Sequence, residues 1–323
     1  MKPHRLLPTA RMFFALWIVF AFLSTGAGYT QQKEGDTYPT RPVTFIIPYP
    51  PGAGKDLSSR LIAKEAEKFL GQPVVPVNKT GTAVGTAAIA VAKPDGYTIG
   101  ISGHHASFLL PLLESVPYHP IRDFKHIMQF GSYNFGIVVK SDSPFKSFKE
   151  LIAHARQNPG KVTWGAPPGG MAYFITDQIA KKENVQFTHI PYKGSPEMQP
   201  ALLGGHIDFG VGDFSYSLVE AGQIRVLLVL REESAPEYPK TPVLKDVGYN
   251  DIPAPACIFI VAPKGTPDGI VKTLEAAFTK AWKEPAFVKG MKDLRMPIFY
   301  RDNKELDEYA ARNFEFFTKY LKK

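Results

Sequence analysis

The sequence predicts an α/β fold with two lobes, each built around a largely parallel sheet. Short apolar strands alternate with amphipathic helices from residue 42 onward, a pattern that favours parallel sheets with ligands at the carboxyl ends of the strands. A strand, a loop rich in glycine and proline, and a helix start occur at 45–56 and again at 162–172. The 323 residues are enough for two domains with buried cores.

The elements of the first lobe follow from apolar runs separated by glycine and proline. Strands are expected at 42–47, 71–77, 97–101 and 135–140. A small-residue helix is expected at about 84–92. The run LSSRLIAKEAEKFL after Asp56 places its apolar residues on one helical face, so Asp56 is the expected N-cap of another helix.

The second lobe repeats the alternation. Strands are expected at 162–164, 188–191, 206–211 and 226–230, with helices starting near 172 and 195. The strand 206–211 ends before Asp213 and Phe214, which places both residues at the ligand edge of the second lobe. A strand at 258–261 returns the chain to the first lobe, so we expect lobe 1 at 40–139 plus 257–323 and lobe 2 at 140–256.

The first loop, in FIIPYPPGAGKD, has the chemistry of an anion site. A helix start offers free N–H groups and the positive end of its dipole, and glycine lets a ligand approach the backbone. The phosphate-binding pattern G-x-x-x-x-G-K-[ST] fails because Tyr49 and Asp56 replace its first glycine and its hydroxyl, and G-x-G-x-x-G fails at Ser59. A carboxylate needs neither pattern. The alternative is a tight structural turn without a ligand.

The N-terminus indicates export. Basic residues precede the apolar run MFFALWIVFAFL and a stretch of small residues, the form of a signal peptide over residues 1–28. An uncleaved signal anchor is the alternative. The formal net charge of +8 suits an anionic small ligand, whereas the scattered Lys and Arg residues and the export signal argue against nucleic-acid binding. We therefore expect a periplasmic protein.

Enzyme motifs are absent from the sequence. It has no G-x-S-x-G elbow, H-E-x-x-H helix or C-x-x-C pair. His104 and His105 are adjacent on an extended segment and point to opposite sides, so they are poor joint metal ligands. The single cysteine, Cys257, lies in an apolar run and is expected to pack rather than react. We expect no cofactor and no metal, although a catalytic site assembled in three dimensions remains the alternative.

Five segments resemble a known family. They are PYPPGAGKD at 48–56, LGQPVVPVNKTGTAVGTAAIAVAKPDGYT at 70–98, HIPYKGSPEMQPALLGGHIDF at 189–209, EAGQIRVL at 220–227 and APKGTP at 262–267. In this order they resemble the extracytoplasmic receptors of tripartite tricarboxylate transporters, the Bug or TctC family. The resemblance covers the chain after the signal peptide and implies a type II periplasmic binding protein of Venus-flytrap form, with a hinge between two α/β lobes.

The resemblance also implies a site and partners. Backbone amides of the two loops would hold a ligand carboxylate; the implied donors are Gly52, Ala53, Gly54, Gly169, Gly170 and Met171. Asp213 is a weaker assignment, and Tyr49 would form an aromatic wall or pack over the turn. The receptor, by default a monomer, would deliver its ligand to membrane permease subunits. A receptor that reports to a sensor kinase is the alternative.

Several positions depart from the family pattern. Lys55 stands where a small residue is common, and it either binds a second carboxylate or projects into solvent. Ala53 replaces a common glycine, the segments after Asn78 and after Asp213 look short, and Phe108 replaces an asparagine, which suggests a more apolar cleft. The remaining candidates for ligand contacts are Asp56, Ser102, His104, Pro168, Tyr173 and Phe214. The ligand's identity stays open among tricarboxylates, dicarboxylates, aromatic carboxylates, amino acids and neutral amides.

Overall fold

The computed structural model describes residues 38–232, 235, 237–253 and 256–321. The strands of this part of the chain form one sheet of six strands and one of five. The predicted signal peptide, residues 1–28, lies outside the described residues.

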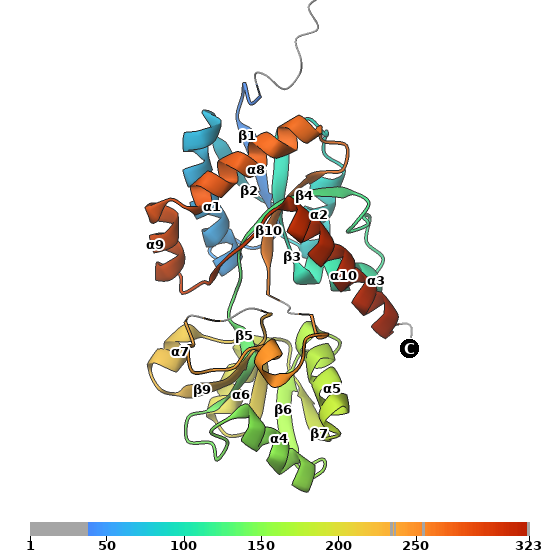
Figure 1. Ribbon diagram of the computed structural model, residues 1–323, viewed down its shortest axis with the longest axis vertical. Helices are drawn as coiled ribbons and strands as arrows, with labels where there is room; N and C mark the ends of the chain where they lie inside the picture. Colours follow the sequence, from blue (N-terminus) through green and yellow to red (C-terminus); the bar gives the residue numbers. More distant parts are fainter. Residues whose placement is uncertain (1–37, 233–234, 236, 254–255, 322–323) are drawn as a thin grey trace, which may run out of the picture. The chain divides into compact units, whose positions relative to one another are not determined.

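The first sheet has the strand order β11-β4-β10-β3-β1-β2 (Figure 1). Its strands are β1 (Val43–Ile47), β2 (Val74–Asn78), β3 (Thr98–Gly103), β4 (Phe124–Gly131), β10 (Ile258–Pro263) and β11 (Ile298–Arg301). β1 pairs in parallel with β2 and β3, whereas β10 runs antiparallel to β3 and β4. The carboxyl ends of β1 and β3 therefore lie at the same edge of this sheet.

Helices bury both faces of the first sheet. They are α1 (Gly54–Leu70), α2 (Thr82–Ala90), α3 (Leu110–Leu113), α8 (Asp268–Trp282), α9 (Pro285–Asp293) and α10 (Asn303–Leu321), with a π-helical turn at His105–Leu109. Phe45 packs against Phe278 of α8 with ring centroids 5.8 Å apart, while Ile46 belongs to the core on the other face. This two-sided burial explains why β1 is continuously apolar.

The second sheet has the order β7-β6-β8-β5-β9. Its strands are β5 (Phe135–Lys140), β6 (Val162–Ala166), β7 (Phe187–Pro191), β8 (Phe209–Asp213) and β9 (Ile224–Val229), and its helices are α4 (Phe148–Gln157), α5 (Met171–Glu183), α6 (Ser195–Leu203) and α7 (Tyr216–Glu220). β6 pairs in parallel with β7 and β8, whereas β5 is antiparallel to β8 and β9. A 3-10 turn at Leu244–Val247 follows.

The pairing of β5 changes the expected lobe boundary. The expected end of lobe 1, residue 139, lies inside β5, yet this strand hydrogen-bonds to β8 and β9 along its length. The change of sheet therefore falls at 132–134, between β4 and β5. Apolar strands such as FGIVVK carry no signal of which sheet they join, so the sequence could not place this boundary.

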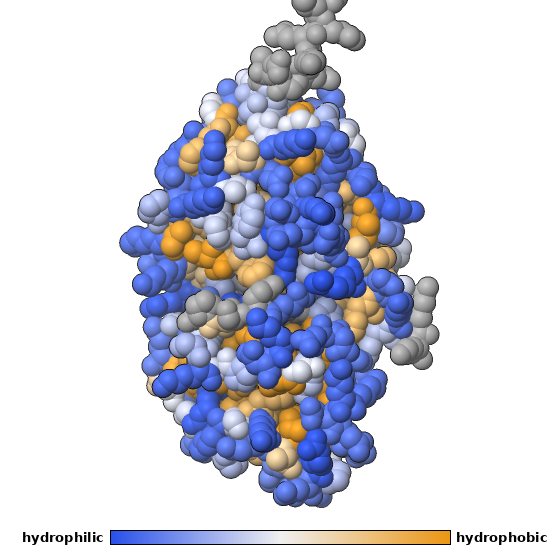
Figure 2. Space-filling model, viewed as in Figure 1, coloured by the Kyte–Doolittle hydropathy of each residue, from blue (hydrophilic) through white to orange (hydrophobic). Residues whose placement is uncertain are grey.

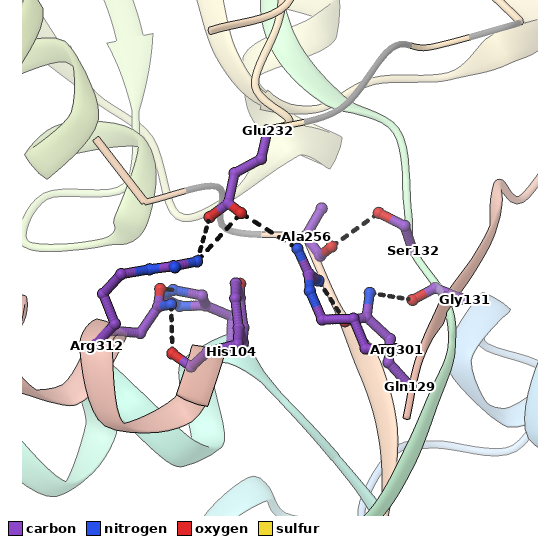
Figure 3. Close-up of polar contacts among 10 residues, drawn as sticks. His104, Gln129, Gly131, Ser132, Glu232, Ala256, Arg301 and Arg312 are labelled. Carbon is purple, nitrogen blue, oxygen red and sulfur yellow. Dashed lines mark hydrogen bonds and ion pairs between the residues drawn. The ribbon is translucent and has the colours of Figure 1, made fainter. Parts of the chain in front are cut away.

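The segments that pass between the sheets are tied together by polar contacts (Figure 3). The Ser132 hydroxyl, just after β4, donates to the Ala256 carbonyl just before β10, at 2.8 Å. Beyond β9, the Glu232 carboxylate accepts hydrogen bonds from Arg301 at 3.3 Å and from Arg312 at 3.2 Å. Glu232 thereby links the chain after the second sheet to β11 and α10.

The face seen in Figure 2 is mostly hydrophilic, with apolar residues in scattered patches. Exposed large apolar side chains do occur in the described part of the chain, for example Val84 and Val91 near α2 and Val288 on α9. Such single exposed residues are normal on a protein surface.

Candidate functional site

The first loop is held in place by Asp56. The Asp56 carboxylate is 1% exposed and accepts hydrogen bonds from the Gly52 N–H at 2.8 Å, from Asn78 Nδ2 at 2.8 Å and from Arg60 Nε at 3.0 Å. Burial raises the pKa of this carboxyl, but the hydrogen bonds from Arg60, Asn78 and Gly52 outweigh it and lower the pKa. Asp56 therefore fixes the conformation of the loop through buried hydrogen bonds and does not itself face a ligand.

The expected N-cap position of Asp56 is wrong. Helix α1 begins at Gly54 with Ala53 as its N-cap, so Asp56 lies in the first turn. The chain turns earlier than expected because Gly52 adopts a left-handed conformation with φ of +81°. As a result Lys55 also enters the first turn.

Loop contacts leave some amides available at the start of α1. The Gly52 N–H is bound to Asp56, and the Ala53 N–H donates to the Pro50 carbonyl at 3.2 Å. Within residues 38–232 and the other described ranges, the N–H groups of Gly54 and Lys55 have no acceptor. Of the implied donors Gly52, Ala53 and Gly54, only Gly54 therefore has a free N–H in the described chain, and Lys55 adds a free N–H that was not implied.

The Lys55 ammonium lies between two aromatic rings. Its Nζ is 4.6 Å from the ring centroid of Tyr49 and 4.6 Å from that of Tyr133. In the described part of the chain no carboxylate lies within 4.0 Å of it. Burial lowers the pKa of Lys55, but interactions with Tyr49 and Asp213 outweigh this and raise it. Lys55 therefore stays protonated, and the two aromatic faces attract its positive charge.

Lys55 lines a cavity of about 400 Å³, and residues at the ends of strands from both sheets line it as well. The lining consists of Tyr49, Ala53, Gly54, Lys55, Tyr133, Asn134, Asp213, Phe214, Tyr216, Leu294, Arg295 and Met296. This volume is within the range of small-molecule sites, and the mixture of aromatic walls with a few charges is typical of them.

Asp213 and Phe214 stand at the end of β8, as predicted. The exposed surface of Asp213 faces the cavity, and withdrawal of its carboxyl from bulk water raises its pKa to about 6, against the opposing effect of Lys55. The Phe214 ring is buried and packs on Tyr238 with centroids 5.6 Å apart. The second sheet thus contributes one titratable group and one apolar wall.

Two predicted side chains at the end of β3 lie in the core. The Ser102 hydroxyl is 2.7 Å from that of Ser107, and Ser102 is 2% exposed. His104 is fully buried, with Nε2 3.0 Å from Asn313 Oδ1 (Figure 3), and burial lowers its pKa to about 3. Neither residue lines the cavity around Lys55, because Ser102 is paired with Ser107 of the π-helical turn and His104 with Asn313 of α10.

The second loop is built as expected but does not line this cavity. Helix α5 begins at Met171, and Gly169 has a φ of +66°. The Gly170 N–H donates to the Pro167 carbonyl at 3.3 Å. The second-loop candidates, Pro168, Gly169, Gly170 and Met171, are not among the cavity's lining residues.

Tyr173 is placed by packing. Its ring lies 5.0 Å from that of His189 and 5.9 Å from that of Trp164, centroid to centroid. It does not line the cavity around Lys55. Binding by the second loop and Tyr173 stays a prediction.

Sequence reasoning missed half of the lining. The missed residues are Tyr133, Asn134, Tyr216, Leu294, Arg295 and Met296. Tyr133 and Asn134 lie between β4 and β5, where an aromatic and a polar residue between two apolar strands gave a weak signal. Arg295 follows α9 and carries no motif.

In the described ranges, no group of three or more His, Cys, Asp or Glu residues is arranged to hold a metal ion. Over the same residues, none of the helices has the length and apolar character needed to cross a bilayer. Cys257 is buried, and burial raises the pKa of its thiol to about 12.

Comparisons with known proteins agree on one family. Residues 58–321 match the family described as "Tripartite tricarboxylate transporter family receptor". The "UPF0065 protein in gbd 5'region" of Cupriavidus necator is 36% identical over 290 residues, 88% of each chain. "Protein BugT" of Bordetella pertussis is 30% identical and covers 85% of this chain and 86% of its own.

Solved structures give the same result. A TctC solute binding protein from Polaromonas is similar with a TM-score of 0.77 and 28% identity, over 87% of this chain and 97% of that one. The periplasmic binding protein BugD is similar with a TM-score of 0.66 and 26% identity, over 88% and 98%. These matches confirm the predicted two-lobed α/β fold, and they are to solute-binding proteins rather than enzymes. The chain therefore belongs to the receptor family of the tripartite tricarboxylate transporters.

Proposed function

We propose that this protein captures a small organic carboxylate in the cavity beside Lys55 and delivers it to the membrane permease of a tripartite tricarboxylate transporter. The observation that carries the proposal is the Lys55 ammonium at the start of α1, in a cavity of about 400 Å³. A cation and a helix N-terminus at one point both favour an anion. The family supplies the role of solute receptor.

The ligand contacts we propose combine prediction and geometry. The residues that are both predicted and part of the lining are Tyr49, Ala53, Gly54, Lys55, Asp213 and Phe214. The free N–H groups of Gly54 and Lys55 would donate to the carboxylate, and the Lys55 ammonium would balance its charge. Second-loop amides at Gly169 to Met171 would join when the lobes close on the ligand.

Closure is part of the proposal because both sheets contribute to one cavity. Lys55 follows β1 of the first sheet, whereas Asp213 ends β8 of the second. A ligand that contacts both stabilises the arrangement in which they are close. We take the lobes to be organised around the two sheets, with hinges at 132–134 and between β9 and β10. Small-angle scattering should show a smaller radius of gyration with ligand than without.

Binding is tested by calorimetry on the mature protein against mono-, di- and tricarboxylates and neutral amides. We expect a carboxylate to bind the wild type and Lys55→Met to weaken it about tenfold or more. Lys149→Met is the control, because Lys149 is an exposed lysine on α4 outside the cavity. Binding of neutral amides only, or equal effects of both variants, would refute a carboxylate site at Lys55.

Export and delivery need separate tests. We propose that residues 1–28 act as the signal peptide, so cell fractionation should find the protein in the periplasm and N-terminal sequencing should find a start near residue 29. Loss of ligand uptake on deleting the receptor gene, restored by the wild type, would support delivery to a permease. Normal uptake in the deletion strain would argue for a sensing role instead.

A further inference from the structure

Two cationic side chains of the described residues line the cavity, and only Lys55 was anticipated from the sequence. Lys55 lies at the start of α1, and Arg295 follows α9. Asp213 is the one carboxylate among the lining residues of this cavity in the described chain. The lining therefore carries an excess of positive charge from two separate elements.

The backbone of Arg295 is held in an uncommon conformation. Its φ is +56°, in the left-handed region that side chains other than glycine and asparagine rarely adopt. The Arg295 N–H donates to the Lys292 carbonyl at 2.9 Å, and its own carbonyl accepts from Asn134 Nδ2 at 2.9 Å. Asn134 lines the same cavity, so this contact fixes Arg295 to the wall of the site. The positive φ belongs to the C-terminal cap of α9: with Leu294 as the C-cap, the N–H groups of Arg295 and Met296 donate to the carbonyls of Lys292 and Met291, and this cap fixes where Arg295 leaves the helix.

The guanidinium of Arg295 has a weak internal partner. One nitrogen lies 3.3 Å from Glu220 Oε1, and both side chains are 47% exposed. The guanidinium carbon is 5.0 Å from the ring centroid of Tyr216. Exposed ion pairs contribute little, and arginine has five N–H donors, so the guanidinium can bind a ligand anion beside Glu220 or in its place.

The rest of the lining is largely apolar. Tyr133, Phe214, Tyr216, Leu294 and Met296 supply aromatic and aliphatic surface. A ligand whose two charged ends meet the two basic side chains would place its middle against this surface. An apolar or aromatic spacer suits it better than a polyhydroxylated one, because the carbonyl oxygen of the Asn134 side chain is the one buried acceptor without a partner among the cavity's described lining residues, and several hydroxyls would need more.

We propose that Lys55 and Arg295 bind the two ends of a dianionic ligand, a diacid with an apolar or aromatic spacer, and that Arg295 makes the receptor prefer diacids to monoacids. The inference rests on the proposed function, since it presumes that a carboxylate binds at Lys55. Arg295 would act through its side chain, whereas the family resemblance implies recognition through backbone amides.

The test compares matched ligands by calorimetry: adipate with hexanoate, and terephthalate with benzoate. For the wild type we expect each diacid to bind about tenfold or more tightly than its monoacid partner. Arg295→Gln should remove most of this preference by weakening the diacid and leaving the monoacid within about twofold. Lys55→Met should weaken both members of a pair.

Two further variants extend the test: one checks that Arg295→Gln does not act through misfolding, and the other removes the carboxylate that competes for Arg295. Arg295→Gly removes the charge and is compatible with the positive φ, so it should fold and should match Arg295→Gln in binding. Glu220→Gln removes the competing carboxylate and should tighten diacid binding up to about fivefold, with no gain for the monoacid. Lys292→Gln is the control, since Arg295 lines both this cavity and a neighbouring one, whereas Lys292 lines the neighbouring cavity and not this one.

The outcomes separate the two proposals. Carboxylate binding that is sensitive to Lys55→Met but keeps the wild-type diacid preference in both Arg295 variants would overturn this inference and leave the proposed function standing. Failure of every carboxylate to bind the wild type would overturn both. Loss of the diacid preference in both Arg295 variants, with no loss in Lys292→Gln, would support the role of Arg295.

Discussion

The imidazole of His104 and the side-chain amide of Asn313 are joined by a hydrogen bond of 3.0 Å between Nε2 and Oδ1 (Figure 3). His104 follows β3 and Asn313 lies on α10, so this contact attaches the C-terminal helix to the first sheet. The rings of Phe108 and Phe317 lie 5.1 and 5.3 Å from the imidazole, centroid to centroid. This apolar cage explains why His104 lies in the core instead of the ligand site.

The cage also predicts how stability depends on pH. Burial lowers the pKa of His104 to about 3, although the hydrogen bond to Asn313 opposes this, whereas an unfolded histidine titrates near 6.5. Between these values the unfolded chain binds the proton and the folded chain does not. The free energy of unfolding should therefore fall as the pH drops below 6.5, by up to about 1.4 kcal/mol per pH unit from this group.

Urea unfolding between pH 4 and 8 measures this effect. His104→Gln can still donate to Asn313, and it should flatten the acid side of the curve while costing about 1–3 kcal/mol near pH 8 through imperfect packing. His154→Gln is the control because His154 is exposed on α4. An unchanged acid slope in His104→Gln would contradict the buried neutral imidazole.

Asp56 should matter for stability more than an ordinary surface carboxylate. Asp56→Ala removes the acceptor shared by Gly52, Asn78 and Arg60. Because Arg60 is 41% exposed and can be rehydrated, we expect a loss of about 2–4 kcal/mol, at the lower end for a broken buried ion pair. Asp293→Ala removes the exposed partner of Lys289 and should cost less than about 1 kcal/mol. Similar urea midpoints for the two variants would rule out the proposed support of the loop.

Much of the fold could be predicted because its signals are local. The strand, loop and helix start at β1 and α1 follow from an apolar run broken by proline and glycine, and Asp213 follows from the end of an apolar strand. Lys55 is in the cavity because it is part of the same local motif. These features depend on periodicity and turn chemistry, which a single sequence carries.

The remainder of the site depends on tertiary packing. Arg295 reaches the cavity only because of the fold around α9, and Tyr133 and Asn134 reach it because the chain changes sheet at 132–134. His104 was placed at the ligand edge from its position after β3, yet α10, about 200 residues later, covers it. No local pattern reports which distant element packs over a strand end.

Gly169→Asp tests the predicted role of the second loop. The backbone at Gly169 is left-handed with φ of +66°, a region that aspartate tolerates better than most residues, and a Cβ there meets no atom within 4 Å. The protein should fold, and the new charge should weaken carboxylate binding at least tenfold if the loop closes on the ligand. Gly160→Asp matches it, with φ of +68° and an equally open site in the turn before β6. Equal ligand affinities in the two variants would remove the second loop from the binding site.

Asp213 should couple ligand binding to protonation. In the free protein Asp213 faces the cavity, and withdrawal of its carboxyl from bulk water raises its pKa to about 6, while Lys55, which remains cationic, opposes this. Tyr133 also faces the cavity, but burial raises the pKa of its hydroxyl, so it stays neutral, and Arg295 adds a fixed positive charge. A bound carboxylate places negative charge near Asp213 and raises its pKa further, so binding takes up a proton.

Affinity for a diacid should therefore increase severalfold as the pH falls from 8 towards 6, a range in which the ligand itself stays dianionic. Calorimetry in buffers of different ionisation enthalpy would count the protons taken up at each pH. Asp213→Asn keeps the shape of the side chain without its charge, so it should bind more tightly than the wild type at pH 8 and show no pH dependence in this range. If Asp213 instead accepts a hydrogen bond from an ammonium or hydroxyl group of the ligand, the same variant will bind more weakly at pH 8.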